Sequence, residues 1–546
     1  MIWPSRVKTI GLLVVFGVIH GAAQVRVTID SGVLEGFASG GDSVFLGVPF
    51  AAPPTGDRRW KPPEFSVRWT GVRSAARFGP ICPQAATDFP ELTVRFSEVV
   101  AGYPYYTDAR MDEDCLYLNV WSRNVGKPKK LPVMVWIHGG SNIGGSGALP
   151  PFGPKLAAKG VVYVSINYRL GALGFLAHPA LTSESPHRAS GNYGILDQIA
   201  ALQWVRRNIT AFGGDAANVT VFGESAGGTM ICYLMASPLA RGLFHRAILQ
   251  SCTCRDYVSP ELKRSIRYET GTGSSEDAGV KLLSASSDLR KLRARPAGEI
   301  VRVSERNGDV LNFLYSGGTV DGWVLPEQPA LTFAAVRQAH IPVLTGSNAD
   351  EGTVMLGALG QATLANYRAW LKAQFDAYAE LVFRAYPAET DAGVRAAYLA
   401  VTADYQRGQA VRSMARDTVR AGQRAYLYYF SYPPKGSYAR EGLGTFHGLD
   451  LSFAGGGFFR KSRWGEPDAE DLRLAEIMSG YWTQFAATGD PNRPGLPEWM
   501  PYDPVTDKAL ELGRDNKMIG VPNAGRFSVF ERILASRLAG MAKGTE

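Results

Sequence analysis

Six stretches of the chain are almost continuously hydrophobic instead of alternating between hydrophobic and polar positions. Each has the length of a strand and is bounded by glycine or polar residues, which predicts six β-strands. Continuous hydrophobicity is typical of strands that are buried on both faces, as in a parallel sheet covered by helices. The six stretches are 131–140, 161–168, 218–225, 246–251, 341–348 and 424–432.

The segments between these strands add the rest of the fold. Residues 194–212 repeat hydrophobic positions at i, i+3 and i+4, which predicts a helix. Alternation of strands and helices predicts an α/β fold with a large, mostly parallel sheet. Residues 25–39 alternate instead, which predicts a small antiparallel hairpin at one edge of the sheet. We expect a single domain over 24–546, with helical cap or surface insertions near 265–335 and 355–420.

The composition of the 546 residues is that of a globular protein, with 45% hydrophobic and 20% charged residues. The formal net charge of +8 is spread along the chain. A nucleic-acid partner normally requires a clustered basic face, so we predict no nucleic-acid partner.

The first 23 residues have the layout of a secretory signal peptide. Arg6 and Lys8 precede a short apolar run, and small residues then lead to a predicted cleavage site after Ala23. The run is shorter than the roughly 20 residues that cross a bilayer. We therefore predict a secreted or periplasmic protein without stable membrane insertion.

The five cysteines are too few for a disulfide scaffold and lack the spacing of a zinc site. In an exported protein one bridge, between Cys82 and Cys115, is compatible with the sequence. Cys252 and Cys254 are too close along the chain for an unstrained bridge. Because the count is odd, at least one thiol must stay unpaired within the chain.

Ser225 lies in the sequence GESAG (223–227), between the third predicted strand and a helical stretch. A serine before a helix is often an N-cap, but a cap requires no flanking glycines. A nucleophile elbow does require them, because its sharp turn brings the strand and the helix too close for a Cβ atom. The pattern therefore favours Ser225 as a nucleophile.

A serine nucleophile needs a base, and in α/β-hydrolases the acid and then the histidine follow the serine along the chain. Among the seven histidines, three follow Ser225. His245 lies just before the strand that follows the Ser225 helix, which leaves no room for an acid-bearing strand between them, and His340 precedes a strand and so lies at the wrong end of the sheet. His447 follows the last predicted strand in a glycine-bounded loop, so we predict that it is the base.

Two acids and one glycine-rich loop complete the pattern. Asp350 and Glu351 both follow the strand at 341–348, and either could orient the imidazole; their spacing does not choose between them. Residues 136–147 begin in the last part of the first strand and continue beyond it. They are similar to a glycine-rich loop that offers N–H donors to an oxyanion, and a second donor site is expected at Ala226. The loop lacks the lysine of a phosphate-binding P-loop.

Together these features resemble the type-B carboxylesterases, a family that includes cholinesterases and bacterial p-nitrobenzyl esterases. The resemblance covers nearly the whole chain after the leader. It implies an α/β-hydrolase fold and hydrolysis of small-molecule carboxylic esters through an acyl-enzyme, with no metal and no organic cofactor. The matching segments are FLGVPFAAPPTGDRRWKPP (45–63), EDCLYLNVW (113–121), SINYRLGALGFL (165–176), GNYGILDQIAALQWVRRNITAFGGD (191–215), VFGESAGG (221–228), NADEGT (348–353) and YWTQFAATGDPN (481–492).

The resemblance also assigns individual residues. It makes Glu351, not Asp350, the acid, and it matches Glu224 to a buried glutamate that polarises the active site. The implied site is Ser225, Glu351 and His447 for catalysis, with the N–H groups of Gly140, Ser141 and Ala226 for the oxyanion.

Further matches concern the framework around the site. Cys82 and Cys115 occupy the positions of the family's first bridge, and Arg59 and Glu113 those of a structural ion pair. The family's second bridge is expected to be absent, because no cysteine follows Cys254.

The chain also departs from the family at three positions. Ser141 replaces glycine or alanine, and Asn142 replaces an aromatic residue. Tyr105 stands where cholinesterases carry a tryptophan for quaternary ammonium groups, which disfavours choline esters because tyrosine makes the weaker cation–π contact.

Two other functions fit the same fold. One is a non-enzymatic adhesion protein, but such relatives lack the serine or the histidine, whereas this chain has all three triad members. The other is a serine peptidase, which more often carries an appended propeller; the roughly 50-residue repeats of a propeller are not seen.

Overall fold

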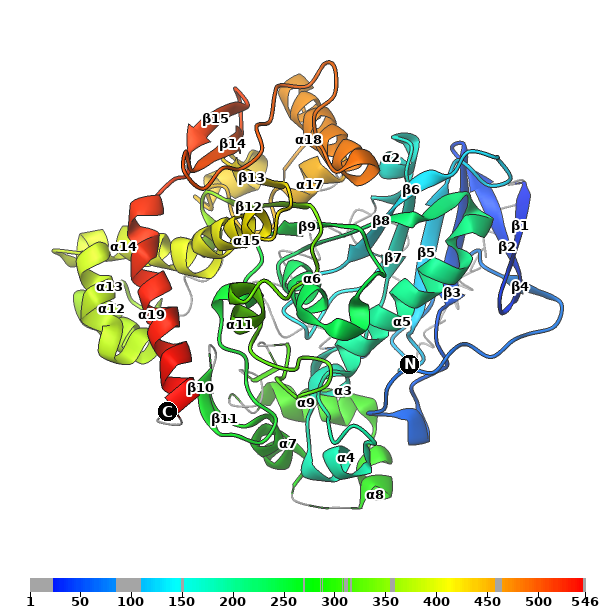
Figure 1. Cartoon of the computed structure of the whole chain (residues 1–546), viewed down its shortest axis with the longest axis horizontal. Coiled ribbons are helices and arrows are strands. Elements are labelled where there is room, and N and C mark those ends of the chain that lie inside the picture. Colours follow the sequence, from blue (N-terminus) through cyan, green and yellow to red (C-terminus); the bar gives the residue numbers. More distant parts are fainter. Residues whose placement is uncertain are drawn as a thin grey trace, which may run out of the picture.

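The computed structural model describes residues 23–84, 110–148, 152–268, 271–353 (except 285, 287, 307, 309–312 and 315–316), 359–456 and 464–543. Apart from Ala23, the predicted leader lies outside these residues. Figure 1 shows the described part as a broad twisted sheet with helices against it.

The sheet follows the order β1-β2-β3-β5-β7-β6-β8-β9-β12-β13-β14-β15, with β4 paired to β2 (Figure 1). Neighbours from β7 to β14 run parallel, whereas the other neighbours in this order are antiparallel; β4 pairs with β2 in parallel. The strands are β1 (Gln24–Ile29), β2 (Gly32–Ser39), β3 (Asp42–Pro49), β4 (Val72–Ser74), β5 (Tyr117–Ser122), β6 (Leu131–Ile137), β7 (Val162–Ile166), β8 (Gly214–Glu224), β9 (Arg246–Gln250), β12 (Val343–Asn348), β13 (Ala425–Phe430), β14 (Lys508–Leu512) and β15 (Lys517–Gly520).

The six predicted hydrophobic strands are confirmed as β6, β7, β8, β9, β12 and β13. The alternating segment at 25–39 is confirmed as the antiparallel hairpin of β1 and β2 at the sheet edge. The mostly parallel sheet with helices agrees with the predicted α/β-hydrolase fold.

Burial on both faces explains the continuous hydrophobicity of the central strands. Val133 and Val135 of β6 pack into one hydrophobic core with residues of α5 and α6. Met134 and Trp136, which alternate with them, belong to a second core shared with α2 and α18. Because the two faces of β6 are both covered, neither leaves room for the polar positions that a half-exposed strand would carry.

Helices make up most of the remaining secondary structure of the described residues. The predicted helix at 194–212 is α5, which continues as the 3₁₀ turn η2 to Phe212. The helices are α2 (Gly153–Ala158), α3 (Gly171–Phe175), α4 (Pro179–Glu184), α5 (Tyr193–Asn208), α6 (Ala226–Ala236), α7 (Ser275–Leu283), α8 (Leu289–Arg293), α9 (Ala297–Arg306), α11 (Pro329–Ala334), α12 (Leu364–Phe375), α13 (Ala379–Ala385), α14 (Asp391–Ala403), α15 (Gln409–Arg420), α16 (Gly436–Arg440), α17 (Leu451–Ala454), α18 (Ala469–Thr488) and α19 (Ala524–Lys543).

The two predicted insertions contain helices in the structure. The first holds α7, α8, α9 and α11, together with a short hairpin of β10 (Ile266–Tyr268) and β11 (Gly271–Gly273). The second holds α12 to α15, and α12 to α14 share a third hydrophobic core with α19. Their exact boundaries as insertions stay a prediction. Within the described residues, no helix combines the length and the hydrophobicity that a membrane crossing requires.

Two disulfides join segments around the sheet. The predicted bridge between Cys82 and Cys115 is present. The family's second bridge, to a cysteine downstream of Cys254, was expected to be absent; Cys254 instead forms a bridge that was not predicted, with the upstream Cys232. Cys232 lies in α6, and the chain returns along β9 to bring Cys254, in the 3₁₀ turn η4 (Cys254–Asp256), beside it. The partner therefore precedes Cys254 along the chain, and Cys252 is the free, buried thiol.

Candidate active site

Ser225 lies at the sharp junction between β8 and α6. Its φ of +56° and ψ of −125° are an uncommon conformation for a residue other than glycine. Although Ser225 is at the N-cap position of α6, its side chain makes no capping hydrogen bond. The hydroxyl is therefore not used to cap the N-terminus of α6. The strained backbone holds it at the carboxyl edge of the sheet.

The flanking glycines are required by the end of β6. A Cβ atom at Gly227 would lie 2.1 Å from the carbonyl oxygen of Ile137, and one at Gly223 would lie 2.6 Å from the same oxygen. Both distances are far below any tolerated contact with backbone. The two glycines thus let β8, α6 and β6 approach closely enough to form the turn.

Glu351 and His447 are joined directly. The Nδ1–H group of His447 donates to Glu351 Oε2 at 2.5 Å. Glu351 Oε1 accepts from the hydroxyl of Ser251 at 2.6 Å and from the backbone N–H of Asn348 at 2.8 Å. Asp350 points elsewhere, since its carboxylate accepts from the backbone N–H of Thr445 at 2.7 Å. Of the two acids that the spacing allowed, the structure brings Glu351 to the imidazole.

The other ring nitrogen faces the elbow. His447 Nε2 lies 3.1 Å from Oε1 of Glu224, the residue immediately before Ser225. Neither the hydrogen bonds nor the ion pairs of the described residues join Ser225 to His447. Contacts between a catalytic base and its nucleophile are commonly long without substrate and tighten when substrate binds.

Burial and mutual charge set the protonation of this group of residues. Burial raises the pKa of Glu224 to about 7, against the opposing effect of His447. Burial alone would lower the pKa of His447, but the carboxylates of Glu224 and Glu351 outweigh it and the pKa is raised. For Glu351, burial acts upward, yet the charge and hydrogen bond of His447 lower its pKa below the usual value. Glu351 is therefore the ionised partner and Glu224 the readily protonated one.

The glycine-rich loop after β6 reaches the same place. Gly140, Ser141 and Asn142 have consecutive positive φ values of 106°, 54° and 62°. A Cβ atom built on Gly139 would lie 3.3 Å from that of Ser225, so the loop directly adjoins the elbow. Among the hydrogen bonds of the described residues, none uses the backbone N–H of Gly140, Ser141 or Ala226 as its donor.

Comparison with known proteins adds a second line of evidence. A model of the Carboxylesterase family matches residues 23–530. The chain is 39% identical over 486 residues to fumonisin B1 esterase of Sphingopyxis macrogoltabida, covering 87% of this chain and 84% of that protein. The chain belongs to the carboxylesterase family.

Two further relatives of this carboxylesterase are esterases of different origin. Liver carboxylesterase 1 of Oryctolagus cuniculus is 34% identical, with 88% of this chain and 87% of that protein covered. Para-nitrobenzyl esterase of Bacillus subtilis (strain 168) is also 34% identical, with 89% and 94% covered. The protein is thus a carboxylic ester hydrolase, in agreement with the resemblance found in its sequence.

Other predicted residues of the carboxylesterase are also located. Arg59 pairs with Glu113, its Nε donating to a carboxylate oxygen at 2.7 Å. Tyr105 lies outside the described residues. In the part of the chain that the structure describes, no cluster of three or more His, Cys, Asp or Glu side chains could hold a metal ion. Activity without a metal or cofactor stays a prediction.

Sequence reasoning missed two residues that hold the site of the carboxylesterase together. Ser251 supports Glu351, and Gln84 clamps the loop through two hydrogen bonds with Gly145, of 2.8 and 2.9 Å. Ser251 follows directly after β9, so its place at the carboxyl edge of a strand was a usable signal. Gln84 belongs to no motif, and only the folded chain brings it to the loop.

Proposed function

We propose that this carboxylesterase hydrolyses esters by acyl transfer to Ser225, with His447 as the base and Glu351 as the acid that orients it. The observation that supports this proposal most directly is the position of the His447 imidazole. Glu351 binds its Nδ1, and its Nε2 faces the elbow, 3.1 Å from Oε1 of Glu224, the residue before Ser225. His447 removes the serine proton, the alkoxide attacks the ester carbonyl, and the alcohol leaves with that proton. Water then repeats the cycle and releases the acid.

The negative charge of each tetrahedral intermediate needs donors that are already in place. The unused N–H groups of Gly140, Ser141 and Ala226, beside the elbow, support an oxyanion hole at this position. Backbone donors do not depend on the side chain, so Ser141 can serve in place of the family's glycine or alanine.

Glu224 supports the same cycle. When ionised, its carboxylate stabilises the imidazolium that forms as His447 accepts the proton, because the two groups are buried 3.1 Å apart. The named substrates of the relatives, fumonisin B1 and para-nitrobenzyl esters, differ from one another and do not fix the acyl or alcohol group of this enzyme's small-molecule substrate.

The test is replacement of Ser225 by alanine. We expect turnover of a p-nitrophenyl ester to fall by roughly 10⁴- to 10⁶-fold, because the covalent step is lost. Ser183→Ala, at an exposed position of α4, is the matched control and should keep parental turnover. An organophosphate should label the parent protein on Ser225; labelling of another residue, or near-parental turnover of Ser225→Ala, would refute the assignment.

We also propose that the protein is exported and cleaved after Ala23. The layout of residues 1–23 supports this, and so do two disulfides, which persist mainly in oxidising compartments. N-terminal sequencing of protein recovered from outside the cytoplasm tests it: a first residue of Gln24 is expected, and an intact Met1 would contradict the proposal.

A further inference from the structure

Arg407 lies on an irregular turn beside the active site. The helices α14 and α15 are continuous except for η7 (Asp404–Gly408), one turn of π-helix between them. Such turns are rare and are found frequently at functional sites. The turn contacts β12, the strand whose end leads into Glu351.

The guanidinium of Arg407 has no carboxylate partner among the described residues. The side chain is half-buried. Among the described residues its buried Nε has no hydrogen-bond partner, and its Nη1 contacts the carbonyl oxygen of Gln406 at 3.4 Å. A buried cation without a partner is destabilising, so arginines in protein interiors are normally paired.

The fully buried arginines Arg169 and Arg293 are paired in the usual way. Arg169 donates to both oxygens of Asp197, at 2.7 and 2.8 Å. Arg293 donates to both oxygens of Glu184, at 2.9 and 2.5 Å. Arg246, half-buried like Arg407, also has an Nε without a hydrogen bond among the described residues, but its Nη1 donates to Asn218 and to the carbonyl oxygen of Ala486. Arg407 has the same guanidinium donors as these other arginines, but no carboxylate of the described residues accepts from them.

The charge of Arg407 reaches the active site. Burial is the largest influence on the pKa of each of Glu224, Glu351, His447 and the thiol of Cys252, and the charge of Arg407 acts on all four in the direction that lowers the pKa. A cation here opposes the imidazolium that the reaction must form, although it also favours the ionised form of Glu351.

We propose that Arg407 is a specificity-determining residue that binds a carboxylate carried by the ester substrate. The planar guanidinium matches a carboxylate through two parallel hydrogen bonds, a geometry that lysine cannot offer. A bound anion also offsets the charge of Arg407 and so removes its opposition to the imidazolium. The preferred substrates are therefore half-esters of dicarboxylic or polycarboxylic acids, or esters whose alcohol part bears a carboxylate. This inference rests on the proposed roles of Ser225, His447 and Glu351.

The test compares charged and neutral esters of matched shape. Monoethyl glutarate and ethyl pentanoate differ by a carboxylate on the acyl side, and 4-acetoxybenzoate and 4-methylphenyl acetate by one on the alcohol side. In each pair the ratio of kcat/KM, charged over neutral, is measured for the parent, Arg407→Gln, Arg407→Lys and the control Arg395→Gln, at an exposed position of α14.

For at least one pair we expect the ratio to fall roughly 10- to 100-fold in Arg407→Gln, the range for a charge-assisted hydrogen bond. Arg407→Lys should lose less, and Arg395→Gln should leave the ratio at its parental value. With the neutral ester, Arg407→Gln should also move the acid limb of the pH profile to higher pH, because His447 loses a neighbouring cation.

Equal ratios in the parent and in Arg407→Gln for both pairs would overturn the inference. The ratio cancels any general loss of folded enzyme, so a weakened variant still gives an answer. Failure of the proposed function would give a different result from failure of this inference. In that case the variant Ser225→Ala would still hydrolyse the neutral esters.

Discussion

At the scale of single residues, the imidazole of His447 lies between two carboxylates that behave differently. Glu351, bound to Nδ1, has a lowered pKa and stays ionised, whereas burial raises the pKa of Glu224, beside Nε2, to about 7. The three groups titrate together, so a pH profile reports the set and not one residue.

The acid limb of kcat/KM tests this arrangement. His447 must be neutral to act as a base, and its pKa is raised, so activity should rise through a midpoint above the ordinary value of 6.5. Glu224→Gln removes a charge that favours the imidazolium, so the pKa of His447 should fall. We expect the midpoint to move to lower pH by roughly half to one pH unit, measured with a neutral ester.

Glu389→Gln, at an exposed position before α14, is the control and should leave the midpoint of the acid limb unchanged. A midpoint that moves to higher pH in Glu224→Gln, or does not move, would show that Glu224 does not act on the base.

At the scale of elements, the active site depends on the crossing of β6, β8 and α6. The carbonyl oxygen of Ile137, at the end of β6, lies where side chains at Gly223 and Gly227 would be. The same strand continues into the loop of Gly140 and Ser141. Its end therefore fixes the elbow and the proposed oxyanion donors relative to one another.

Gly227→Ala tests this packing. The new methyl group would lie 2.1 Å from the backbone oxygen of Ile137, which cannot yield without moving β6. We expect a loss of roughly 1–3 kcal/mol in unfolding free energy from overpacking. We also expect kcat/KM to fall by about 100-fold, because a shift near 1 Å misplaces the nucleophile.

Gly525→Ala is the matched control, because a Cβ atom at this position of α19 meets no atom within 4 Å. Its unfolding free energy should equal or exceed the parental value by up to about 1 kcal/mol. Parental stability and activity in Gly227→Ala would mean that the elbow tolerates a side chain.

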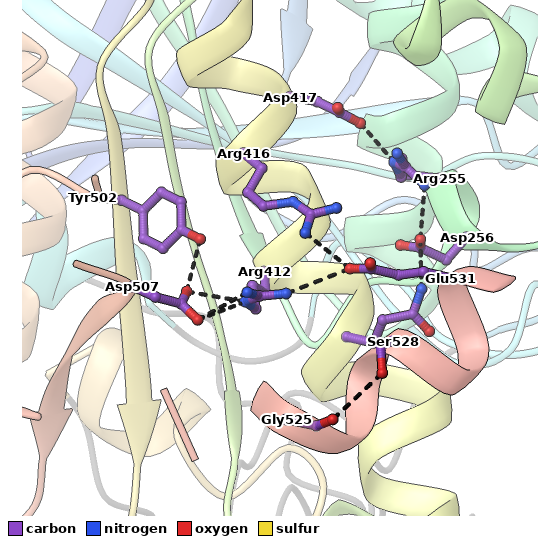
Figure 2. A network of polar contacts seen from close by, with 11 residues as sticks. Arg255, Asp256, Arg412, Arg416, Asp417, Tyr502, Asp507, Gly525, Ser528 and Glu531 are labelled. Carbon is purple, nitrogen blue, oxygen red and sulfur yellow. Dashed lines mark hydrogen bonds and ion pairs between the residues drawn. The ribbon is translucent and has the colours of Figure 1, made fainter. Parts of the chain in front are cut away.

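At the scale of the whole molecule, an ion-pair network links the carboxyl-terminal helix to the rest of the fold. Figure 2 shows Arg412 of α15 between Asp507, just before β14, and Glu531 of α19. Arg416 also pairs with Glu531, at 2.9 Å. Arg255, in η4, pairs with Asp417 of α15. The helix α15 therefore joins distant parts of the chain.

Arg412→Met should loosen this docking without touching the active site. Two half-buried carboxylates lose their shared partner, for which we expect a loss of roughly 1–3 kcal/mol in unfolding free energy. Amide hydrogen exchange in α19 should become faster while kcat/KM stays parental. Arg532→Met, at an exposed position of the same helix, is the control. Unchanged exchange in α19 would contradict a docking role for Arg412.

The hydrophobic pattern and the motifs of the sequence were enough to predict the central strands and much of the candidate site. Continuous hydrophobicity identified the six central strands because helices cover both faces of the sheet, and alternation identified the edge hairpin. The glycines around Ser225 and the order of serine, acid and histidine pointed to the elbow and to His447. These features are readable along the chain because each depends on local geometry or on strand order.

Only the tertiary structure decided what depends on proximity between distant segments. The spacing of Asp350 and Glu351 left the acid open, and only the family resemblance favoured Glu351. The structure shows that Glu351 contacts His447 while Asp350 points to Thr445, a direction that spacing alone cannot contain. The pairing of Cys232 with Cys254, and the contact of β12 with the turn that carries Arg407, result from helices folding back onto the sheet. Periodicity reports which residues are buried, whereas packing determines which buried groups meet.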